Sequence, residues 1–195
     1  KLYNNTPLVF IDRYFPKINI PYVSSDEYEG VKNAVNYLVK LRHKKITCIQ
    51  GLEGTFSNTS RTNAFIDTIK HHGLNTNENF IIGDAFSEEN GYTCAKQIIK
   101  ENKNQLPTAI LSLSNTITLG ILKAFNEENI LVPEKVSIIS FDEEGYSSLL
   151  KTPMTTISQP KEKLGKTAFK MLLEQMESDK KLKQKSKKKN KIYHS

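Results

Sequence analysis

The chain has 195 residues, of which 37% are hydrophobic and 25% are charged, a composition typical of a globular protein with one core or two small ones. No apolar run reaches the roughly 18 residues that span a membrane, and the first residues lack the order of a signal peptide. These features argue against a membrane or secreted protein and favour a cytoplasmic one. Because the sequence begins with Lys1 rather than Met, we expect it to be part of a longer chain.

The net charge of +7 comes from one segment near the end of the sequence. KKLKQKSKKKNK, residues 180–191, holds eight lysines and no acid, and without these lysines the net charge falls to −1. A run of like charges is typical of a solvated linker. A strip that contacts phosphates is the alternative, although the run has no interleaved aromatic residues.

Strand-like apolar runs alternate with amphipathic segments along the chain. The predicted strands are PLVFID (7–12), KITCIQG (45–51), FIIG (80–83), TAILSLS (108–114) and VSIISFD (136–142). Apolar residues at helical spacing predict helices at 27–43, 60–73, 88–102 and 115–129, and a further helix at 161–177 after the crossing segment MTTISQP (154–160). This alternation predicts parallel βαβ units, and therefore the α/β class with doubly wound parallel sheets.

Polar residues stand where several predicted strands end, namely Asp12, Gly51, Ser114 and Asp142. In open α/β sheets, ligands bind beyond the carboxyl ends of the strands. Asp142 is therefore a candidate acceptor for the hydroxyl or amine groups of a ligand. A helix N-cap or a turn is the alternative role for an aspartate in this position.

Catalytic and metal-binding patterns are weak. GLEGTFS lacks the spacing of a phosphate-binding P-loop, and neither G-x-G-x-x-G nor G-x-S-x-G occurs. The four histidines form no metal-ligand pattern, and Cys48 and Cys94 lie in apolar runs without metal or disulfide spacing. We therefore expect buried free thiols, no metal, no cofactor and no enzymatic activity.

Several blocks together resemble a known family. PLVFIDR, LRHKKITCIQG, SRTNAF, GDAFSEENGY, PTAILSLSNTITLGILKAFNEENILVPEKVSIISFDE and TPMTTISQPKEKLGKTAFKMLL stand in the order found in the effector-binding core of LacI/GalR (lactose-repressor/galactose-repressor) regulators. The resemblance implies a periplasmic-binding-protein-like type I fold, in which two Rossmann-like subdomains hold a small effector between them. It also implies that the N-terminal subdomain is incomplete here, and that the helix-turn-helix DNA-binding domain lies outside this sequence.

The same resemblance divides the chain into four parts. Residues 1–24 correspond to the end of the N-terminal subdomain and residues 25–154 to the C-terminal subdomain. Residues 155–182 return to the N-terminal subdomain, and residues 183–195 hold the basic segment and the start of a C-terminal strand.

Ligand-binding residues follow from the resemblance one by one. Arg61 matches an arginine that holds sugar hydroxyls or a carboxylate, a task suited to its planar fork of donors. Asp142 matches an aspartate that accepts from ligand hydroxyls, and Asp12 an acidic residue of the other subdomain. Phe86 matches the aromatic residue that stacks on the ligand. Further candidates are loop residues that contact ligand in some members, namely Thr55 and Ser57, and Ser114, which stands where the family often has asparagine.

The function implied is that of an effector-binding and dimerisation domain of a transcription regulator. A small ligand, most simply a sugar or sugar derivative, would contact both subdomains and thereby change the affinity for operator DNA. The family forms homodimers, and the helix face of TLGILKAFNEEN (118–129) fits either such a contact or the core. A periplasmic sugar-binding protein of a transport system, which shares the fold, is the alternative.

Overall fold

The computed structural model describes residues 6–13, 15, 17–77, 80–101, 105–142 and 153–189. The chain divides into two compact units, which are treated separately below. Unit 1 comprises residues 1–25 and 160–195, and unit 2 comprises residues 26–159.

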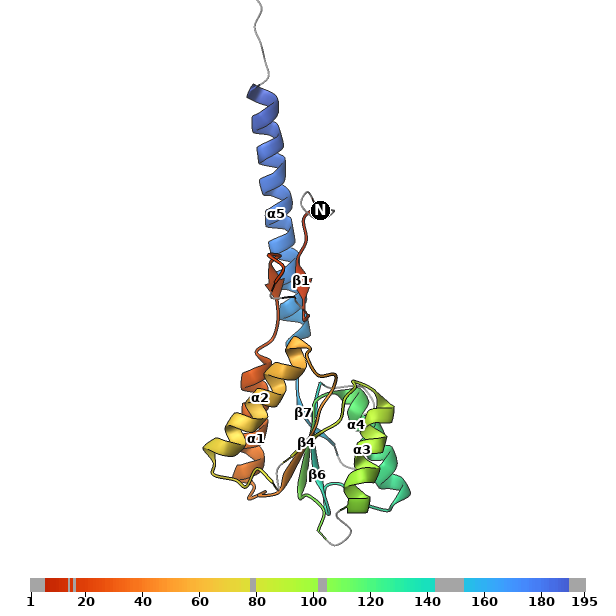
Figure 1. Cartoon of the computed structure of the whole chain (residues 1–195). Helices are drawn as coiled ribbons and strands as arrows, with labels where there is room; N and C mark the ends of the chain where they lie inside the picture. Colours follow the sequence, from red (N-terminus) through yellow and green to blue (C-terminus); the bar gives the residue numbers. More distant parts are fainter. Residues whose placement is uncertain are drawn as a thin grey trace, which may run out of the picture. The chain divides into compact units, whose positions relative to one another are not determined.

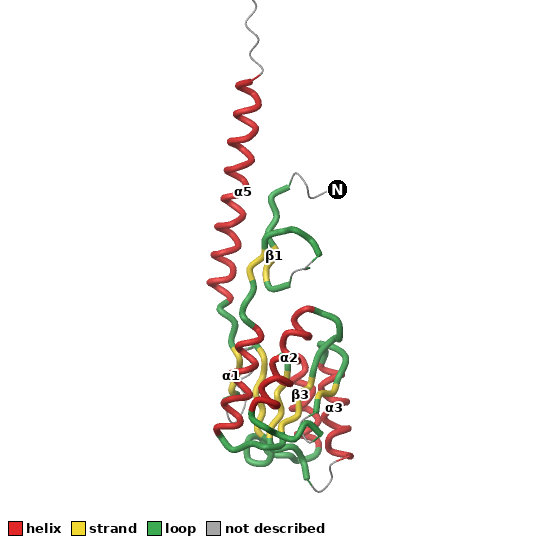
Figure 2. The backbone as a smooth tube through the Cα atoms, turned by 60° about the vertical axis from the view of Figure 1, so that its left-hand side comes forward, coloured by secondary structure: helices red, strands yellow, loops and turns green. Residues whose placement is uncertain are grey.

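Unit 2 is built on a five-stranded parallel sheet with the strand order β4-β3-β5-β6-β7. The strands are β3 (Ile46–Ile49), β4 (Ile81–Ile82), β5 (Ala109–Ser112), β6 (Ser137–Phe141) and β7 (Thr155–Ile157). Helices α1 (Glu27–Lys40) and α2 (Phe56–His71) cover one face, and α3 (Glu88–Glu101) and α4 (Asn115–Glu127) cover the other (Figure 1). Figure 2 shows the same layering from a second direction. The predicted α/β class with a doubly wound parallel sheet is confirmed.

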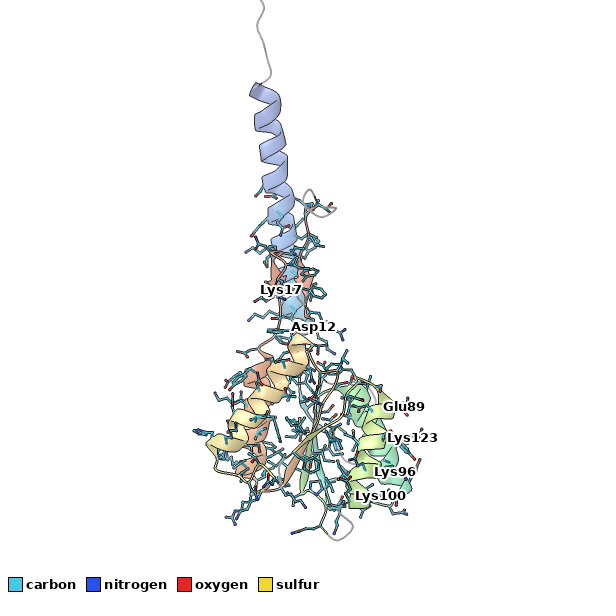
Figure 3. All side chains as sticks on the ribbon, in the orientation of Figure 1. Asp12, Lys17, Glu89, Lys96, Lys100 and Lys123 are labelled. Atoms are coloured by element: carbon cyan, nitrogen blue, oxygen red, sulfur yellow. The ribbon has the colours of Figure 1, made fainter. Side chains whose placement is uncertain are left out.

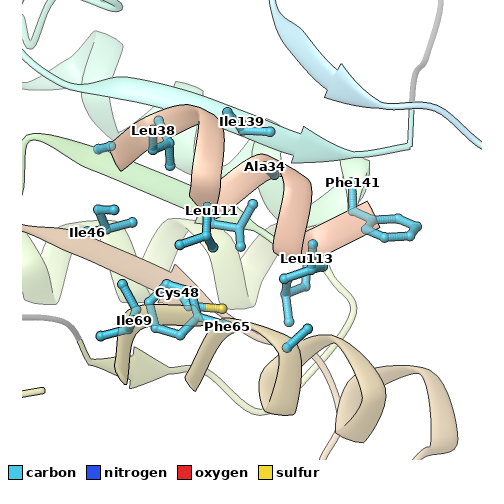
Figure 4. Packing of buried hydrophobic residues seen from close by; sticks show 14 residues of the cluster. Ala34, Leu38, Ile46, Cys48, Phe65, Ile69, Leu111, Leu113, Ile139 and Phe141 are labelled. Atoms are coloured by element: carbon cyan, nitrogen blue, oxygen red, sulfur yellow. The ribbon is translucent and has the colours of Figure 1, made fainter. Parts of the chain in front are cut away.

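The core of unit 2 lies in two layers, one on each face of the sheet. All four residues of β3 and of β5 are buried, because strands covered on both faces need apolar side chains on both. Between the sheet and helices α1 and α2, Figure 4 shows Leu38, Phe65 and Ile69 packed against Ile46 and Leu111. The second layer joins α3 and α4 to the opposite face.

Two glycines allow α3 and α4 to approach closely. A Cβ atom built on Gly91 would overlap the backbone carbonyl of Ile117, and one built on Gly120 would overlap that of Glu88. On the outer surface of the same pair, Lys96 of α3 bonds to Glu127 at 2.9 Å and Glu128 at 2.6 Å (Figure 3). Hydrogen bonds to these carboxylates, Glu128 first, raise the pKa of Lys96.

Unit 1 contains a two-stranded parallel sheet and one long helix. Strand β1 (Phe10–Ile11) pairs with β2 (Tyr22–Val23), and α5 (Lys161–Lys189) contacts both strands. The side-chain amide of Gln175 fixes α5 to Leu8, two residues before β1, because it accepts from the Leu8 N–H at 3.0 Å and donates to the Leu8 carbonyl at 3.2 Å.

Two expectations concern the end of the chain. Residues 180–189 of the lysine run, for which a solvated linker was predicted, are helical, because α5 continues to Lys189 and lysine is a good helix former. The start of a C-terminal strand was placed on residues that include 190–195, which lie outside the described residues. Within the described helices, none is long and apolar enough to cross a membrane.

Candidate functional site

The candidate site lies at the carboxyl ends of the parallel strands of unit 2. Because the strands are parallel, the segments that follow β3, β5 and β6 emerge at one edge of the sheet. Six of the seven sequence-predicted ligand residues belong to this unit, namely Thr55, Ser57, Arg61, Phe86, Ser114 and Asp142.

Arg61 links the ends of two strands. It projects from α2 and is buried, with its Nη1 donating to the carbonyl of Leu113 at 2.6 Å, just after β5. The centre of its guanidinium lies 3.6 Å from the centroid of the Phe141 ring, at the end of β6. A planar cation stacked on an aromatic ring is a favourable contact, so Arg61 holds a defined orientation at the strand ends.

The counter-charge of Arg61 is Glu27, in the first turn of α1. Its Oε1 lies 2.6 Å from Nη2 of Arg61, and the side chains are only 5% and 7% exposed. No sequence pattern indicates this pair, because an acid in the first turn of a helix is explained by the helix dipole alone. Glu27 is therefore a site residue that sequence reasoning missed.

Asp142 stands directly after β6 in the left-handed backbone region, with a φ of 67°. Its N–H donates to the carbonyl of Ile157 at 3.0 Å, which continues the pairing of β6 with β7. Its two carboxylate oxygens accept from Nε2 of Gln159 at 2.9 and 3.1 Å. Gln159, which sequence reasoning also missed, thus orients the carboxylate and leaves it further lone pairs for a ligand.

Three side-chain amides connect the loops after β3 and β4. Nε2 of Gln50 donates to the Gly83 carbonyl at 2.9 Å and to Glu53 at 3.1 Å, while its Oε1 accepts from Asn58. Asn58 in turn accepts from the N–H of Gly51 at 2.9 Å. Asn90 at the start of α3 donates to the carbonyl of Gln50. The loops are therefore held by a buried network, which stabilises their shape.

The three predicted hydroxyl residues, Thr55, Ser57 and Ser114, have different structural roles. Thr55 is the N-cap of α2, and its hydroxyl donates to the Leu52 carbonyl at 2.8 Å. Ser114 is the N-cap of α4, and its Oγ accepts from the N–H of Thr116 at 3.1 Å. Capping accounts for both residues structurally. Ser57 lies half-buried in the first turn of α2.

Phe86 is half-buried in the loop between β4 and α3, and its ring lies against Gly51. A Cβ on Gly51 would overlap three carbon atoms of that ring, so this close approach requires glycine. Phe86 also packs against the core layer beneath α3 and α4.

Asp12 belongs to unit 1 and has the same local geometry as Asp142. It directly follows β1, its φ is 67°, and its N–H donates to the carbonyl of Val23 in β2 at 2.9 Å. Its Oδ1 is buried and has no hydrogen-bond partner among the described residues. Aspartate tolerates a positive φ better than most residues, yet two such positions at strand ends are typical of functional sites.

Two features of the described residues bear on metal binding and nucleophilic chemistry. In the part of the chain that the structure describes, no group of three or more His, Cys, Asp and Glu residues suits a metal ion. Cys94 of α3 lies near the amide network, where burial, assisted by the charge of Asp84, raises the pKa of its thiol to about 11. A thiol with such a pKa is a poor nucleophile at neutral pH.

Comparison with known proteins agrees with this geometry. A family model described as a periplasmic binding protein-like domain matches residues 35–191. The HTH-type transcriptional repressor CytR of Escherichia coli (strain K12) is 31% identical over 174 residues, which make up 89% of this chain and 50% of that protein. The HTH-type transcriptional repressor PurR of Haemophilus influenzae (strain Rd) is 30% identical over 174 residues, or 89% of this chain and 51% of that protein. The chain thus spans about half the length of the curated relatives it matches.

A solved structure extends the comparison. A transcriptional regulator of the LacI family from Burkholderia phymatum is 27% identical, with a TM-score of 0.75 over 86% of this chain and 60% of that one. The predicted resemblance to LacI/GalR regulators and the predicted fold are confirmed by these relatives. The parallel five-stranded unit and the match over residues 35–191 show that the chain belongs to the family of periplasmic binding protein-like domains.

Proposed function

We propose that this chain is the effector-binding part of a cytoplasmic LacI/GalR-type transcription regulator, and that it binds a small polyhydroxylated ligand such as a sugar. The observation that carries the proposal is the position of Arg61. Its guanidinium bonds to the carbonyl of Leu113 after β5 and stacks on the ring of Phe141, the last residue of β6, which Asp142 follows in the sequence. One guanidinium and one oriented carboxylate offer a donor and an acceptor for vicinal hydroxyls. The two curated repressors named above support the regulatory role.

The remaining ligand residues of unit 2 complete the proposed site. Phe86 supplies an aromatic face beside Gly51, and Ser57 a half-buried hydroxyl on α2. Thr55 and Ser114 contribute through the loops they cap. Unit 2 corresponds in this proposal to the C-terminal subdomain, and unit 1 to the end of the N-terminal subdomain with its returning helix.

A ligand screen by thermal denaturation tests the binding step. A ligand that binds only the folded state raises the melting temperature, by an amount that grows with its concentration. We expect a sugar to raise the melting temperature of the chain, and Asp142→Asn to abolish the effect. Asp67→Asn, at an exposed position of α2 where the carboxylate accepts a hydrogen bond from Tyr28, is the matched control. A sugar response that survives in Asp142→Asn would contradict the site.

Asp12 is proposed to couple binding to DNA affinity. A ligand that contacts one unit alone has no differential affinity for two arrangements of the units, so coupling needs a group from unit 1. Asp12 is that group because its backbone repeats the strand-end geometry of Asp142. In a full-length protein, Asp12→Ala should reduce the effect of the ligand on operator affinity. Undiminished coupling would reject this assignment.

We also propose a homodimer. Exposed apolar side chains, Leu41, Leu119 and Leu131 among them, line a groove of about 750 Å³ along the edge of β7, between α1 and α4. Sedimentation analysis should show a dimer that Leu119→Ser weakens, whereas Leu52→Ser, at a more exposed position in the loop after β3, should leave it intact. Equal behaviour of the two variants would exclude this surface.

The alternative is a periplasmic sugar-binding protein of a transport system. The curated relatives are named transcriptional repressors, which favours the regulator and is also why no enzymatic role is proposed. A ligand response without any ligand-dependent operator binding by the full-length protein would favour the alternative.

A further inference from the structure

We propose that Glu27 sets the charge preference of the ligand site: by neutralising Arg61 it directs the site toward uncharged polyhydroxylated ligands and against phosphates and carboxylates. This inference rests on the proposed sugar-binding function and narrows the ligand class. Without an acidic partner, an arginine in a ligand site would favour an anion, because the planar donors of its guanidinium match carboxylate and phosphate oxygens.

The first argument is that the guanidinium of Arg61 already has a counter-charge within the protein. Nη2 of Arg61 lies 2.6 Å from Oε1 of Glu27, and Nη1 lies 2.6 Å from the Leu113 carbonyl. Both charged side chains are more than nine-tenths buried, so solvent screens the pair weakly. The positive charge of Arg61 is therefore already compensated within the protein, and an entering anion would meet a neutral pair rather than a free cation.

The second argument comes from the two atoms that the pair leaves unused. Nε of Arg61 and Oε2 of Glu27 are buried and have no hydrogen-bond partner among the described residues. Buried polar atoms normally find partners. Because neither atom reaches the surface, the pair acts on a ligand through its net charge rather than through direct contact with these atoms. The unshared carboxylate oxygen keeps negative charge beside the guanidinium, which further lowers the attraction of Arg61 for an anion.

The third argument is the charge of the surrounding loops. The described segments that follow the strands, residues 50–55, 83–87, 113–114, 142 and 158–159, contain no lysine or arginine. They contain three acids, Glu53, Asp84 and Asp142. Arg42, Lys44 and Lys45, by contrast, precede β3 at the opposite end of the sheet. The excess of negative charge at the ligand end repels anions.

Matched ligand pairs test the inference on the chain itself. D-ribose is compared with ribose 5-phosphate, D-glucose with glucose 6-phosphate, and D-galactose with galacturonate, by thermal denaturation followed by calorimetric titration. We expect at least one sugar to bind, and its anionic counterpart to bind at least tenfold more weakly. Added sodium chloride should leave the affinity for the sugar unchanged and improve that for the anion, because salt screens the repulsion.

Glu27→Gln removes the charge while keeping the shape and one acceptor for Arg61. We expect the ratio of anion to sugar affinity to rise about tenfold in this variant. Glu29→Gln is the matched control, because it removes the same charge two residues away on the same helix, where the side chain is 46% exposed and paired with Lys32. We expect that control to change the ratio less than twofold.

The outcomes separate the inference from the proposed function. If the unaltered chain binds the sugar phosphates as tightly as the sugars or more tightly, the inference about Glu27 is overturned, although a ligand site remains. An unchanged ratio of anion to sugar affinity in a folded Glu27→Gln variant has the same meaning. If Glu27→Gln does not fold, the ligand pairs and their salt dependence in the unaltered chain decide. If no member of any pair binds a chain that circular dichroism shows to be folded, the proposed sugar site fails, and this inference fails with it.

Discussion

The buried pair of Glu27 and Arg61 allows a quantitative test by paired substitution. Glu27→Leu leaves a guanidinium 7% exposed without its counter-charge, and Arg61→Met leaves a carboxylate 5% exposed in the same position. Removing one partner of a buried ion pair costs about 3 to 5 kcal/mol, because the other charge remains desolvated. We expect each single variant to lose that much free energy of unfolding.

The double variant should lose far less than the two single variants together. Replacing both charges by apolar groups of similar volume is close to neutral in many proteins. Here it also deprives the Leu113 carbonyl of its donor, which costs about 1 to 3 kcal/mol. We therefore expect the double variant to lose about 1 to 3 kcal/mol, which leaves a coupling energy of about 5 kcal/mol between the two positions.

Urea unfolding followed by far-UV circular dichroism measures these differences. The exposed pair of Glu29 and Lys32 provides the control, and Glu29→Gln should cost less than about 1 kcal/mol. If the losses of the single variants add up in the double variant to within about 0.5 kcal/mol, the two residues are energetically independent. That result would refute the reasoning that the charge of Arg61 is compensated by Glu27.

Three further predictions concern packing and titration. Gly120→Ala would place a Cβ against the Glu88 carbonyl, and we expect thermal denaturation to show a loss of about 1 to 3 kcal/mol in the free energy of unfolding. Gly165→Ala in α5, where no atom lies within 4 Å of the added Cβ, should raise the free energy of unfolding by about 0.5 to 1 kcal/mol. Burial raises the pKa of Cys94 to about 11, so its reaction with Ellman's reagent at pH 8 should be about a hundredfold slower in the folded chain than in urea; equal rates would contradict this. Burial lowers the pKa of His43, so the unfolded chain takes up the proton first as the pH falls. Stability should therefore decline below about pH 6.5, and His43→Gln should reduce the decline in urea titrations.

Much of the fold could be predicted because its elements are amphipathic or uniformly apolar. Strands β3 and β5 are short runs of buried and mostly apolar residues, and hydrophobic patterning finds such runs without any tertiary information. Strand β2 was missed because Tyr22–Val23 is only two residues long and follows Pro21. Helix α2 begins at Phe56, four residues before the predicted start, because Thr55 supplies a cap that the apolar pattern does not include.

Residue patterns alone indicated only the polar residues at strand ends, whereas Arg61 and Phe86 followed from the family resemblance. Asp142 follows β6 directly, so its position along the chain already indicated a role. Glu27 carries no comparable signal, since its contact with Arg61 joins residues 34 positions apart. Gln159 is 17 positions from Asp142, and only the parallel pairing of β6 with β7 brings them together. Sequence patterns report local structure, and these contacts are tertiary.

Asp12 and Asp142 have the same backbone geometry at the ends of strands in two separate sheets. Each follows the last residue of a parallel strand, has a φ of 67°, and donates its N–H to the last residue of the neighbouring strand. A left-handed aspartate costs more than a glycine would in that conformation, so aspartate at both positions is consistent with a role for the carboxylate. In unit 2, where Glu27 neutralises the arginine of the proposed site, the carboxylate of Asp142 remains as an acceptor. A ligand that satisfies this carboxylate must donate a hydrogen bond, which uncharged hydroxyls do and ionised phosphate oxygens do not.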